Sequence, residues 1–261
     1  MFTPSNPARV LANGCPRTTD YRSPAASRAV ALSEGAFTLL ELLIVVGIIG
    51  LLLVLIAPAF TTIKGGTDVT SAAYTIQGAL DTARTYAKAN NTYTWVGFAG
   101  SVGSNTTAVT GQVEVAIVAS KNGTNLWSAN DSLPAASLTQ VGKMMTLDNI
   151  HIGDTGVPSG NGTDFESRPA VDSDHRISSS PNTLYPFTVQ QTTFNKWIQF
   201  SPRGEALVHG GGFSIVNYAE VGVLPTHGTA LAVTQNGNVY LGNLAAVQIS
   251  GFSGSVRIYR R

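Results

Sequence analysis

A long apolar run near the N-terminal end constrains this chain more than any other feature of its sequence. Every residue at positions 42–57 is apolar or glycine, and residues 37–40 extend the run beyond its single charged residue, Glu41. About 20 helical residues reach roughly 30 Å, the thickness of the hydrocarbon core of a bilayer. The run lacks the polar face that a soluble core helix keeps, so we expect a membrane helix.

The segment before the run is rich in proline and mildly basic. Residues 1–36 carry four arginines against Asp20 and Glu34. The positive-inside rule therefore places the N-terminus in the cytoplasm and the C-terminal region on the other side of the membrane. The single cysteine, Cys15, cannot form an intramolecular disulfide. A secretory signal peptide would have a shorter apolar region that ends in a small-residue cleavage site. The run in this chain is longer and is followed by Pro58, and the small residues Gly35 and Ala36 precede it, so it does not fit that pattern.

The residues AFTLLELLIV at positions 36–45 resemble the N-terminal signal of type IV pilins and pseudopilins. The resemblance implies that a prepilin peptidase cuts between Ala36 and Phe37 and methylates the new N-terminus of Phe37. The family usually has glycine before the phenylalanine. This chain has Ala36 there and Gly35 one place earlier, so a cut between Gly35 and Ala36 is the alternative. The resemblance also implies a pilin-like α+β fold, in which a long N-terminal helix packs on an antiparallel β-sheet head.

The position of Glu41 within the apolar run needs a physical explanation, because an ionised side chain in lipid is costly and usually has a partner and a function. The family resemblance implies that its partner is the ammonium of a cleaved Phe37 on an adjacent subunit. This pairing would fix the register of a subunit as it leaves the membrane for a filament. The structural alternative is a carboxylate that extends to the membrane surface.

Pro58 ends the apolar run and predicts a bend in the helix, because proline removes a backbone hydrogen bond and clashes with the preceding turn. Lys64-Gly65-Gly66 suggests a second weak point. From Val69 onward, apolar residues recur at spacings of three and four, which predicts a helix with one apolar stripe to about residue 90. We therefore expect a removed leader at 1–36, a transmembrane half-helix at 37–57, an amphipathic half-helix at 58–90 and a β-rich head at 91–261.

Two sequence patterns and the final strand narrow the resemblance to particular classes of pilin-like proteins. Residues 80–90 are similar to the Leu-x-x-Ala-Arg-x-x-Ala pattern of H-type pseudopilins of type II secretion and of FimT-type minor pilins. Residues 198–204 resemble their Phe-x-Pro-x-Gly turn, and the final strand at 254–261 is also similar. The resemblance implies a minor subunit of a type IV pilus or a type II secretion pseudopilus. The implied partners are the prepilin peptidase, other pilin or pseudopilin subunits, an inner-membrane assembly platform and the lipid bilayer.

Local pattern predicts the strands of the head. Runs of β-branched and aromatic residues occur at 93–98, 112–119, 197–200, 213–216, 231–234, 239–241 and 255–259. Asn122-Gly123 and Asn236-Gly237 are turn signals between them. Residues 151–186 are instead rich in glycine, serine, proline, aspartate and asparagine, which predicts a long surface loop.

Enzymatic and metal-binding patterns are weak. His209-Gly210-Gly211-Gly212 matches an oxyanion string of esterases, but the sequence has no Gly-x-Ser-x-Gly nucleophile elbow. Asp172, Asp174 and His175 are metal-ligand types, but no second cluster accompanies them at ligand spacing. We expect solvated charge there, no metal, no cofactor and no catalysis.

Arg257, Arg260 and Arg261 support one alternative, because some FimT-type minor pilins bind DNA through basic residues near the C-terminus. Arginines can neutralise phosphates without reading sequence. Without the leader, however, basic and acidic residues are nearly balanced, so the chain has no general basic field. Arginines at a strand edge also discourage strand pairing. A second alternative is a signal-anchored extracytoplasmic β-domain that never assembles.

Overall fold

The computed structural model describes residues 38–103, 109–125, 133–155, 164–178, 185–208, 216–231 and 243–261, with only the backbone described at 55–66 and Ser173. Two compact units divide the chain, Met1–Ile49 and Gly50–Arg261. Several predictions lie outside the described residues. They are the cleavage-site residues Gly35, Ala36 and Phe37, the predicted strand at 239–241, most of those at 213–216 and 231–234, the Asn236-Gly237 turn, and His209 to Gly212.

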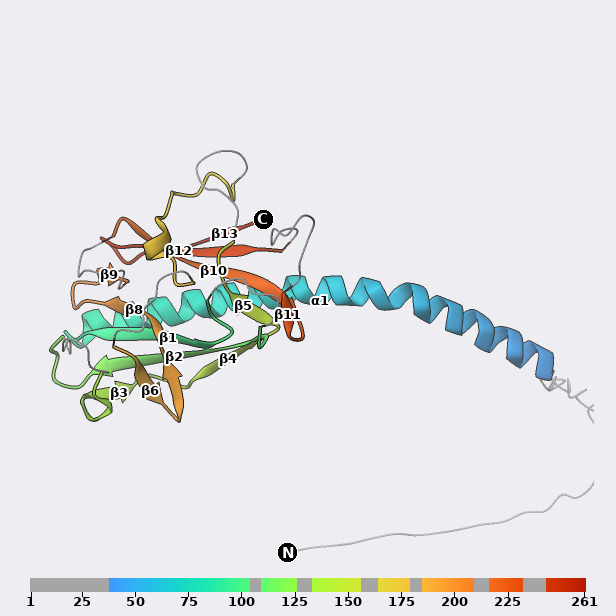
Figure 1. Ribbon diagram of the computed structural model, residues 1–261, viewed down its shortest axis with the longest axis horizontal. Coiled ribbons are helices and arrows are strands. Elements are labelled where there is room, and N and C mark those ends of the chain that lie inside the picture. The colour runs from blue at the N-terminus through green and yellow to red at the C-terminus, as the bar shows by residue number, and fades with distance from the viewer. Residues whose placement is uncertain are drawn as a thin grey trace, which may run out of the picture. The chain divides into compact units, whose positions relative to one another are not determined.

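The chain forms one long helix followed by antiparallel strands (Figure 1). The α+β class with antiparallel sheets is therefore confirmed. In chain order the elements are α1 (Leu39–Ala89), β1 (Thr94–Gly100), β2 (Gln112–Ser120), η1 (Ala135–Ser137), β3 (Leu138–Gln140), β4 (Met145–Asp148), β5 (Ile150–Ile152), η2 (Ser173–His175), β6 (Phe187–Val189), β7 (Thr192–Phe194), β8 (Lys196–Phe200), β9 (Ala206–Leu207), β10 (Tyr218–His227), β11 (Ala230–Leu231), β12 (Ala245–Ser250) and β13 (Val256–Arg260).

Helix α1 is continuous over 51 residues and ends at Ala89, one residue before the predicted end. Pro58 and the predicted weak point at Gly65 and Gly66 lie within this helix, which is not interrupted at either place. In the part of the chain that the structure describes, no helix offers an apolar stretch of membrane-spanning length. The transmembrane half-helix stays a prediction.

The strands form two large sheets where the sequence suggested one. The first has six strands in the order β3-β2-β1-β8-β9, with β4 paired to the other half of β2. The second has five strands in the order β11-β10-β12-β13, with β5 paired to β10. A separate hairpin consists of β6 and β7.

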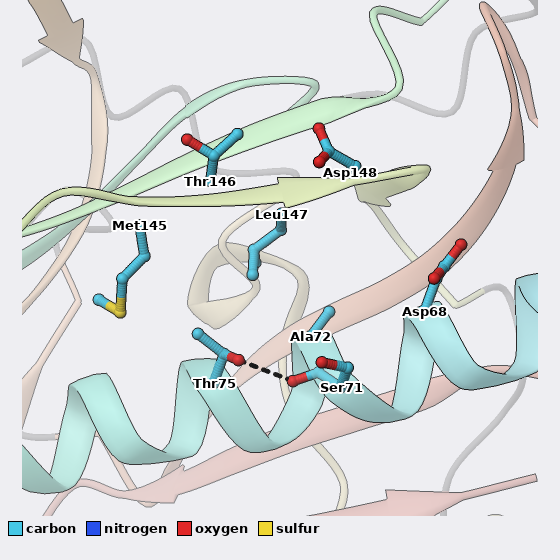
Figure 2. A pocket seen from close by; sticks show the side chains of 8 residues that line it. All are labelled: Asp68, Ser71, Ala72, Thr75, Met145, Thr146, Leu147 and Asp148. Atoms are coloured by element: carbon cyan, nitrogen blue, oxygen red, sulfur yellow. Dashed lines mark hydrogen bonds between the residues drawn. The ribbon is translucent and has the colours of Figure 1, made fainter.

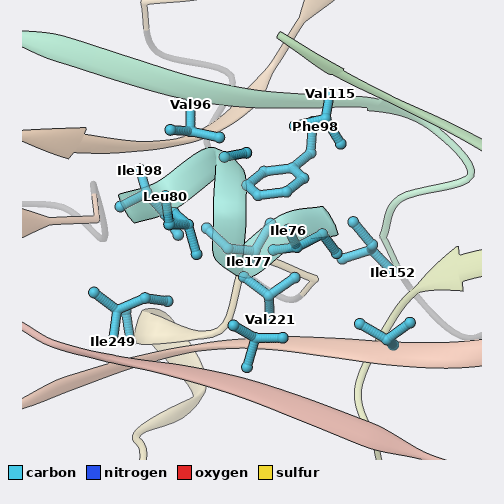
Figure 3. Close-up of a cluster of buried hydrophobic side chains, with 14 of the residues drawn as sticks. Ile76, Leu80, Val96, Phe98, Val115, Ile152, Ile177, Ile198, Val221 and Ile249 are labelled. Atoms are coloured by element: carbon cyan, nitrogen blue, oxygen red, sulfur yellow. The ribbon is translucent and has the colours of Figure 1, made fainter. Parts of the chain in front are cut away.

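The main core lies between these sheets, around the second half of α1 (Figure 3). Val96 and Phe98 of the first sheet face the helix on one side, and Val221 and Ile249 of the second sheet face it on the other. The helix contributes one apolar stripe, which consists of Val69, Ala72, Ala73, Ile76, Ala79, Leu80, Ala83 and Ala87. Burial of a side chain as large as Ile76 or Leu80 contributes about 1.5–3 kcal/mol, so this half of α1 belongs to the head.

Strand β5 connects the two sheets. It pairs with β10 of the second sheet. It also joins the segment that follows β1 of the first sheet, because Ile152 N donates to Ser101 O at 2.8 Å and Gly103 N donates to Ile152 O at 3.0 Å. The connection explains why such a short strand is ordered.

Residues 151–186 are described at 151–155, 164–178 and 185–186, where the chain is mostly irregular apart from the end of β5 and η2. They begin within β5, and the described part buries Phe165, Arg168 and Ile177. Arg168 Nε donates to Glu220 Oε2 of β10 at 2.9 Å, and Arg168 NH1 donates to Phe165 O at 2.9 Å. Polar composition did not show that a charged side chain in this segment has a buried partner far along the chain.

Candidate functional site

The start of α1 is fixed by a reciprocal cap between Thr38 and Glu41. Thr38 N and Thr38 Oγ1 both donate to Glu41 Oε2 at 3.2 Å. In return, Glu41 N donates to Thr38 Oγ1 at 3.2 Å. This arrangement is a capping box, in which two otherwise unpaired donors of the first helical turn are satisfied. Thr-x-x-Glu before an apolar run is the sequence signature of such a box, and it was missed in favour of the family resemblance.

The capping box gives Glu41 a role within its own chain. A carboxylate in the first turn also interacts favourably with the positive end of the helix dipole. The cap keeps the carboxylate at the very start of the helix. It therefore lies three residues from Thr38, the first described residue after the predicted cleavage site.

Beyond the cap, α1 presents apolar side chains in every direction. All residues at 39–54 are exposed, and their large apolar side chains range from 47% exposed at Val45 to 87% at Leu39. A helix that is apolar all round is normally buried by protein or by lipid. A contiguous apolar surface of this extent marks a site of protein or membrane interaction.

The two sequence patterns that narrowed the resemblance meet at the other end of α1. In the Leu-x-x-Ala-Arg-x-x-Ala pattern, Leu80, Ala83 and Ala87 are buried in the core, and Arg84 lies beside the stripe. A β-carbon on Gly204 would lie 3.0 Å from Lys88 Cδ and 3.4 Å from Arg84 Nε. The helix end and the Phe-x-Pro-x-Gly turn are therefore in direct contact.

The turn itself is held by Ser201. Its carbonyl accepts from Gly204 N at 2.8 Å, and its hydroxyl donates to Glu205 Oε2 at 2.9 Å. Gly204 has a φ of +87°, a conformation that favours glycine. The pattern thus encodes a tight turn whose glycine also leaves room for the side chains of α1.

The three C-terminal arginines do not form one patch. Arg257 and Arg260 lie on opposite faces of the edge strand β13, because side chains alternate along a strand. Arg260 NH2 lies 3.5 Å from Asn243 Oδ1, and Arg261 NH2 lies 3.4 Å from Glu166 Oε1. Nothing in this arrangement favours a phosphate-binding surface over charged protection of a sheet edge.

The remaining chemical candidates give no site. His175 Nδ1, at the end of η2, lies 3.7 Å from Oδ2 of Asp172, the residue before η2. Across the described ranges, no three histidine, cysteine, aspartate or glutamate side chains are grouped closely enough to hold a metal ion. The string Gly251-Phe252-Ser253-Gly254, which lacks the spacing of a nucleophile elbow, lies in the turn between β12 and β13.

A buried pair of Ser101 and His151 was not noticed in the sequence. Ser101 Oγ lies 3.0 Å from His151 Nδ1, and the side chains are 3% and 2% exposed. Burial lowers the pKa of His151. His151 Nε2 is buried and has no hydrogen-bond partner among the described residues. Because no substrate could reach this pair, we interpret it as part of the connection made by β5.

Comparison with models of protein families, with curated proteins and with solved structures finds no match to this chain.

Proposed function

We propose that this chain is a structural subunit of a type IV pilus or a type II secretion pseudopilus, and that it has no enzymatic activity. The observation that carries the proposal is the exposed apolar surface of α1 at residues 39–54. Such a surface needs lipid before assembly and neighbouring helices after it. A filament subunit that leaves a membrane uses the same helix first to contact lipid and then to contact neighbouring subunits.

The N-terminal sequence supports the route by which this happens. The chain enters the inner membrane as a prepilin, with residues 1–36 in the cytoplasm and the head outside. The peptidase cuts between Ala36 and Phe37 and methylates Phe37, and the assembly platform then moves the subunit into the filament. The capping box holds the Glu41 carboxylate at the helix start. There it can pair with the ammonium of Phe37 on an adjacent subunit.

The helix end supports a more specific assignment. The Arg84 pattern and the Gly204 turn, which the sequence placed far apart, pack against each other. Their joint presence is what resembles H-type pseudopilins and FimT-type minor pilins, and we therefore propose a minor subunit.

The test is the N-terminal residue of the membrane-extracted protein, measured by mass spectrometry in cells with and without their prepilin peptidase. We expect a methylated Phe37 that appears only when the peptidase is present. A substitution of Ala36 by a bulky residue, such as Ala36→Leu, should block the cut, and Ala36→Gly should preserve it. An intact Met1 in both strains would overturn the proposal.

A further inference from the structure

Strand β13 is one edge of the second sheet, and in the part of the chain that the structure describes it pairs only with β12 (Figure 1). None of its five residues is buried, whereas all residues of β12 except Ser250 are. The other terminal strands of the described sheets, β3, β4, β5, β6, β7, β9 and β11, have two to four residues. Because natural sheets keep exposed edges short, this longer open edge is a candidate for pairing with another chain.

The next longest of these strands, β4, is already used by the fold. Met145 and Leu147 of β4 point toward α1, and Thr146 and Asp148 point away from it (Figure 2). Leu147 is buried in the main core, and Asp148 accepts a hydrogen bond from Gln112 Nε2 of β2 at 2.9 Å. Strand β4 is therefore held within the head through both its apolar and its charged side chains.

The hydrogen bonds at the two ends of β13 show which of its backbone groups face β12. Arg261 N donates to Leu244 O at 3.1 Å, and Ser250 N donates to Ser255 O at 3.0 Å. Bonded pairs alternate with non-bonded pairs along an antiparallel ladder. In the register of β12 and β13, residues 257 and 259 therefore also direct their N–H and C=O groups toward β12.

The backbone groups of Val256, Ile258 and Arg260 consequently point away from the sheet. None of these N–H and C=O groups bonds to another residue in the described ranges. A row of unpaired donors and acceptors on an exposed edge is a template for strand addition, in which an extended peptide joins the sheet as a further strand.

Apolar side chains along this edge would be covered by an added strand. Val256 and Ile258 are half-buried and pack against the main core. Tyr259 packs on the opposite face against a smaller cluster that includes Phe165 and Leu224. A partner with apolar residues beside Val256 and Ile258 would extend the main core outward, which contributes apolar burial and favourable cross-strand contacts.

The charge of the edge is positive. Arg257 and Arg260 are exposed, and neither forms an ion pair with a described residue. Arg261, just beyond the strand, has NH2 3.4 Å from Glu166 Oε1, so its charge has a partner. The strand itself is left with two positive charges, one on each face of the sheet.

The placement of these two arginines selects the kind of partner. An added strand has side chains on both faces, so it can place one carboxylate opposite Arg257 and another opposite Arg260. A nucleic-acid backbone that lies on one face of the sheet would meet only one of them. A second copy of β13 would bring arginines close to arginines, which is destabilising. An extended acidic segment of another protein is therefore the occupant that fits the charge.

We propose that β13 is a strand-addition site for an extended acidic segment of a partner protein. In antiparallel pairing, the partner has carboxylates opposite Arg260 and Arg257 and apolar residues opposite Ile258 and Val256. Its sequence from N- to C-terminus is therefore acidic, any residue, apolar, acidic, apolar. This inference goes beyond the filament proposal and does not depend on cleavage before Phe37, so either can fail without the other.

Hydrogen exchange resolved to single amides, on the full detergent-solubilised chain, tests the site. The probe is the synthetic peptide Thr-Glu-Thr-Val-Glu-Val-Thr, and the control peptide has lysine in place of both glutamates. At nine-tenths occupancy, exchange of the outward amides of Val256, Ile258 and Arg260 should slow about tenfold. The inward amides of Arg257 and Tyr259 are bonded to β12 and should be protected without the peptide. The lysine peptide should protect none of the outward amides at the same concentration.

A charge exchange shows whether the arginines select the partner. The variant Arg257→Glu/Arg260→Glu should bind the glutamate peptide about tenfold more weakly and should bind the lysine peptide instead. Ile258→Pro removes one outward N–H and no bond to β12, so it should also weaken binding. Three outcomes would overturn the inference: outward amides that the glutamate peptide does not protect, equal protection by both peptides, or protection by a single-stranded oligonucleotide that the peptide cannot displace. Protection that rises with the concentration of the chain alone would assign the edge to a second copy and would equally overturn it.

Discussion

The guanidinium of Arg168 and the carboxylate of Glu220 form a fully buried ion pair, with Nε and Oε2 2.9 Å apart. Gln248 Nε2 also donates to Glu220 Oε2 at 2.8 Å, and Thr155 Oγ1 accepts from Arg168 NH2 at 3.1 Å. The pair attaches the segment around residues 164–178 to the second sheet. Because both charges are buried, removal of one leaves the other without its counter-ion.

We expect Glu220→Ala to lower the free energy of unfolding by about 3 kcal/mol or more, which corresponds to a fall in Tm of roughly 10 °C. Thermal unfolding of the detergent-solubilised chain measures the change. The double variant Arg168→Met/Glu220→Met should lose less than Glu220→Ala, because it buries no isolated charge. Equal losses in the two variants would contradict this explanation.

Glu41 has two roles that a conservative substitution separates. Glutamine retains the acceptor of the capping box but has no charge for an ammonium partner. If the charge pair drives assembly, Glu41→Gln should fail to enter filaments as completely as Glu41→Ala, with normal cleavage before Phe37. The measurement is the fraction of the chain recovered in sheared filaments. Thr38→Ser keeps the capping hydroxyl and serves as the control. Wild-type recovery of Glu41→Gln would show that the cap alone accounts for the residue.

His151 should make stability depend on pH. Burial lowers its pKa in the folded state below the usual 6.5, so the unfolded chain binds the proton more tightly. The contribution of the neutral His151 to the free energy of unfolding is complete above pH 6.5. It is lost as the pH falls from 6.5 toward the lowered pKa of the folded state. The Tm difference between the wild type and His151→Gln, measured from pH 8 to pH 5, should therefore change in favour of the variant at low pH. A constant difference would refute this dependence.

Two glycines should respond in opposite directions to alanine. Gly254 has a φ of +63°, and a β-carbon there would collide with the Gly204 carbonyl, so Gly254→Ala should cost about 2 kcal/mol. Gly78 lies on the exposed face of α1 with no atom within 4 Å of an added β-carbon. Gly78→Ala should therefore stabilise the helix by about 1 kcal/mol. Chemical denaturation of both variants gives the comparison, and a loss of stability in Gly78→Ala would show that this face is covered.

The sequence by itself determined the elements whose signal is local. The three- and four-residue spacing from Val69 to Ala87 predicted the helical stripe that the core uses. Runs of β-branched and aromatic residues located β1, β2, β8 and β13 to within a few residues. The capping box at Thr38 and Glu41 is also local, and its signature could have been recognised without coordinates.

Only the tertiary structure decided the second sheet and the contacts that hold it together. Strand β10 contains Glu220, Gly222 and Pro225, which made its sequence unlike a buried strand. Glu220 is tolerated because Arg168 comes from a segment 52 residues away, and Gly222 is needed because the Gly153 carbonyl occupies the place of a β-carbon. The buried pair of Ser101 and His151 is likewise assembled from segments far apart in the chain. Such contacts depend on which residues the fold brings together, and local periodicity carries no information about that choice.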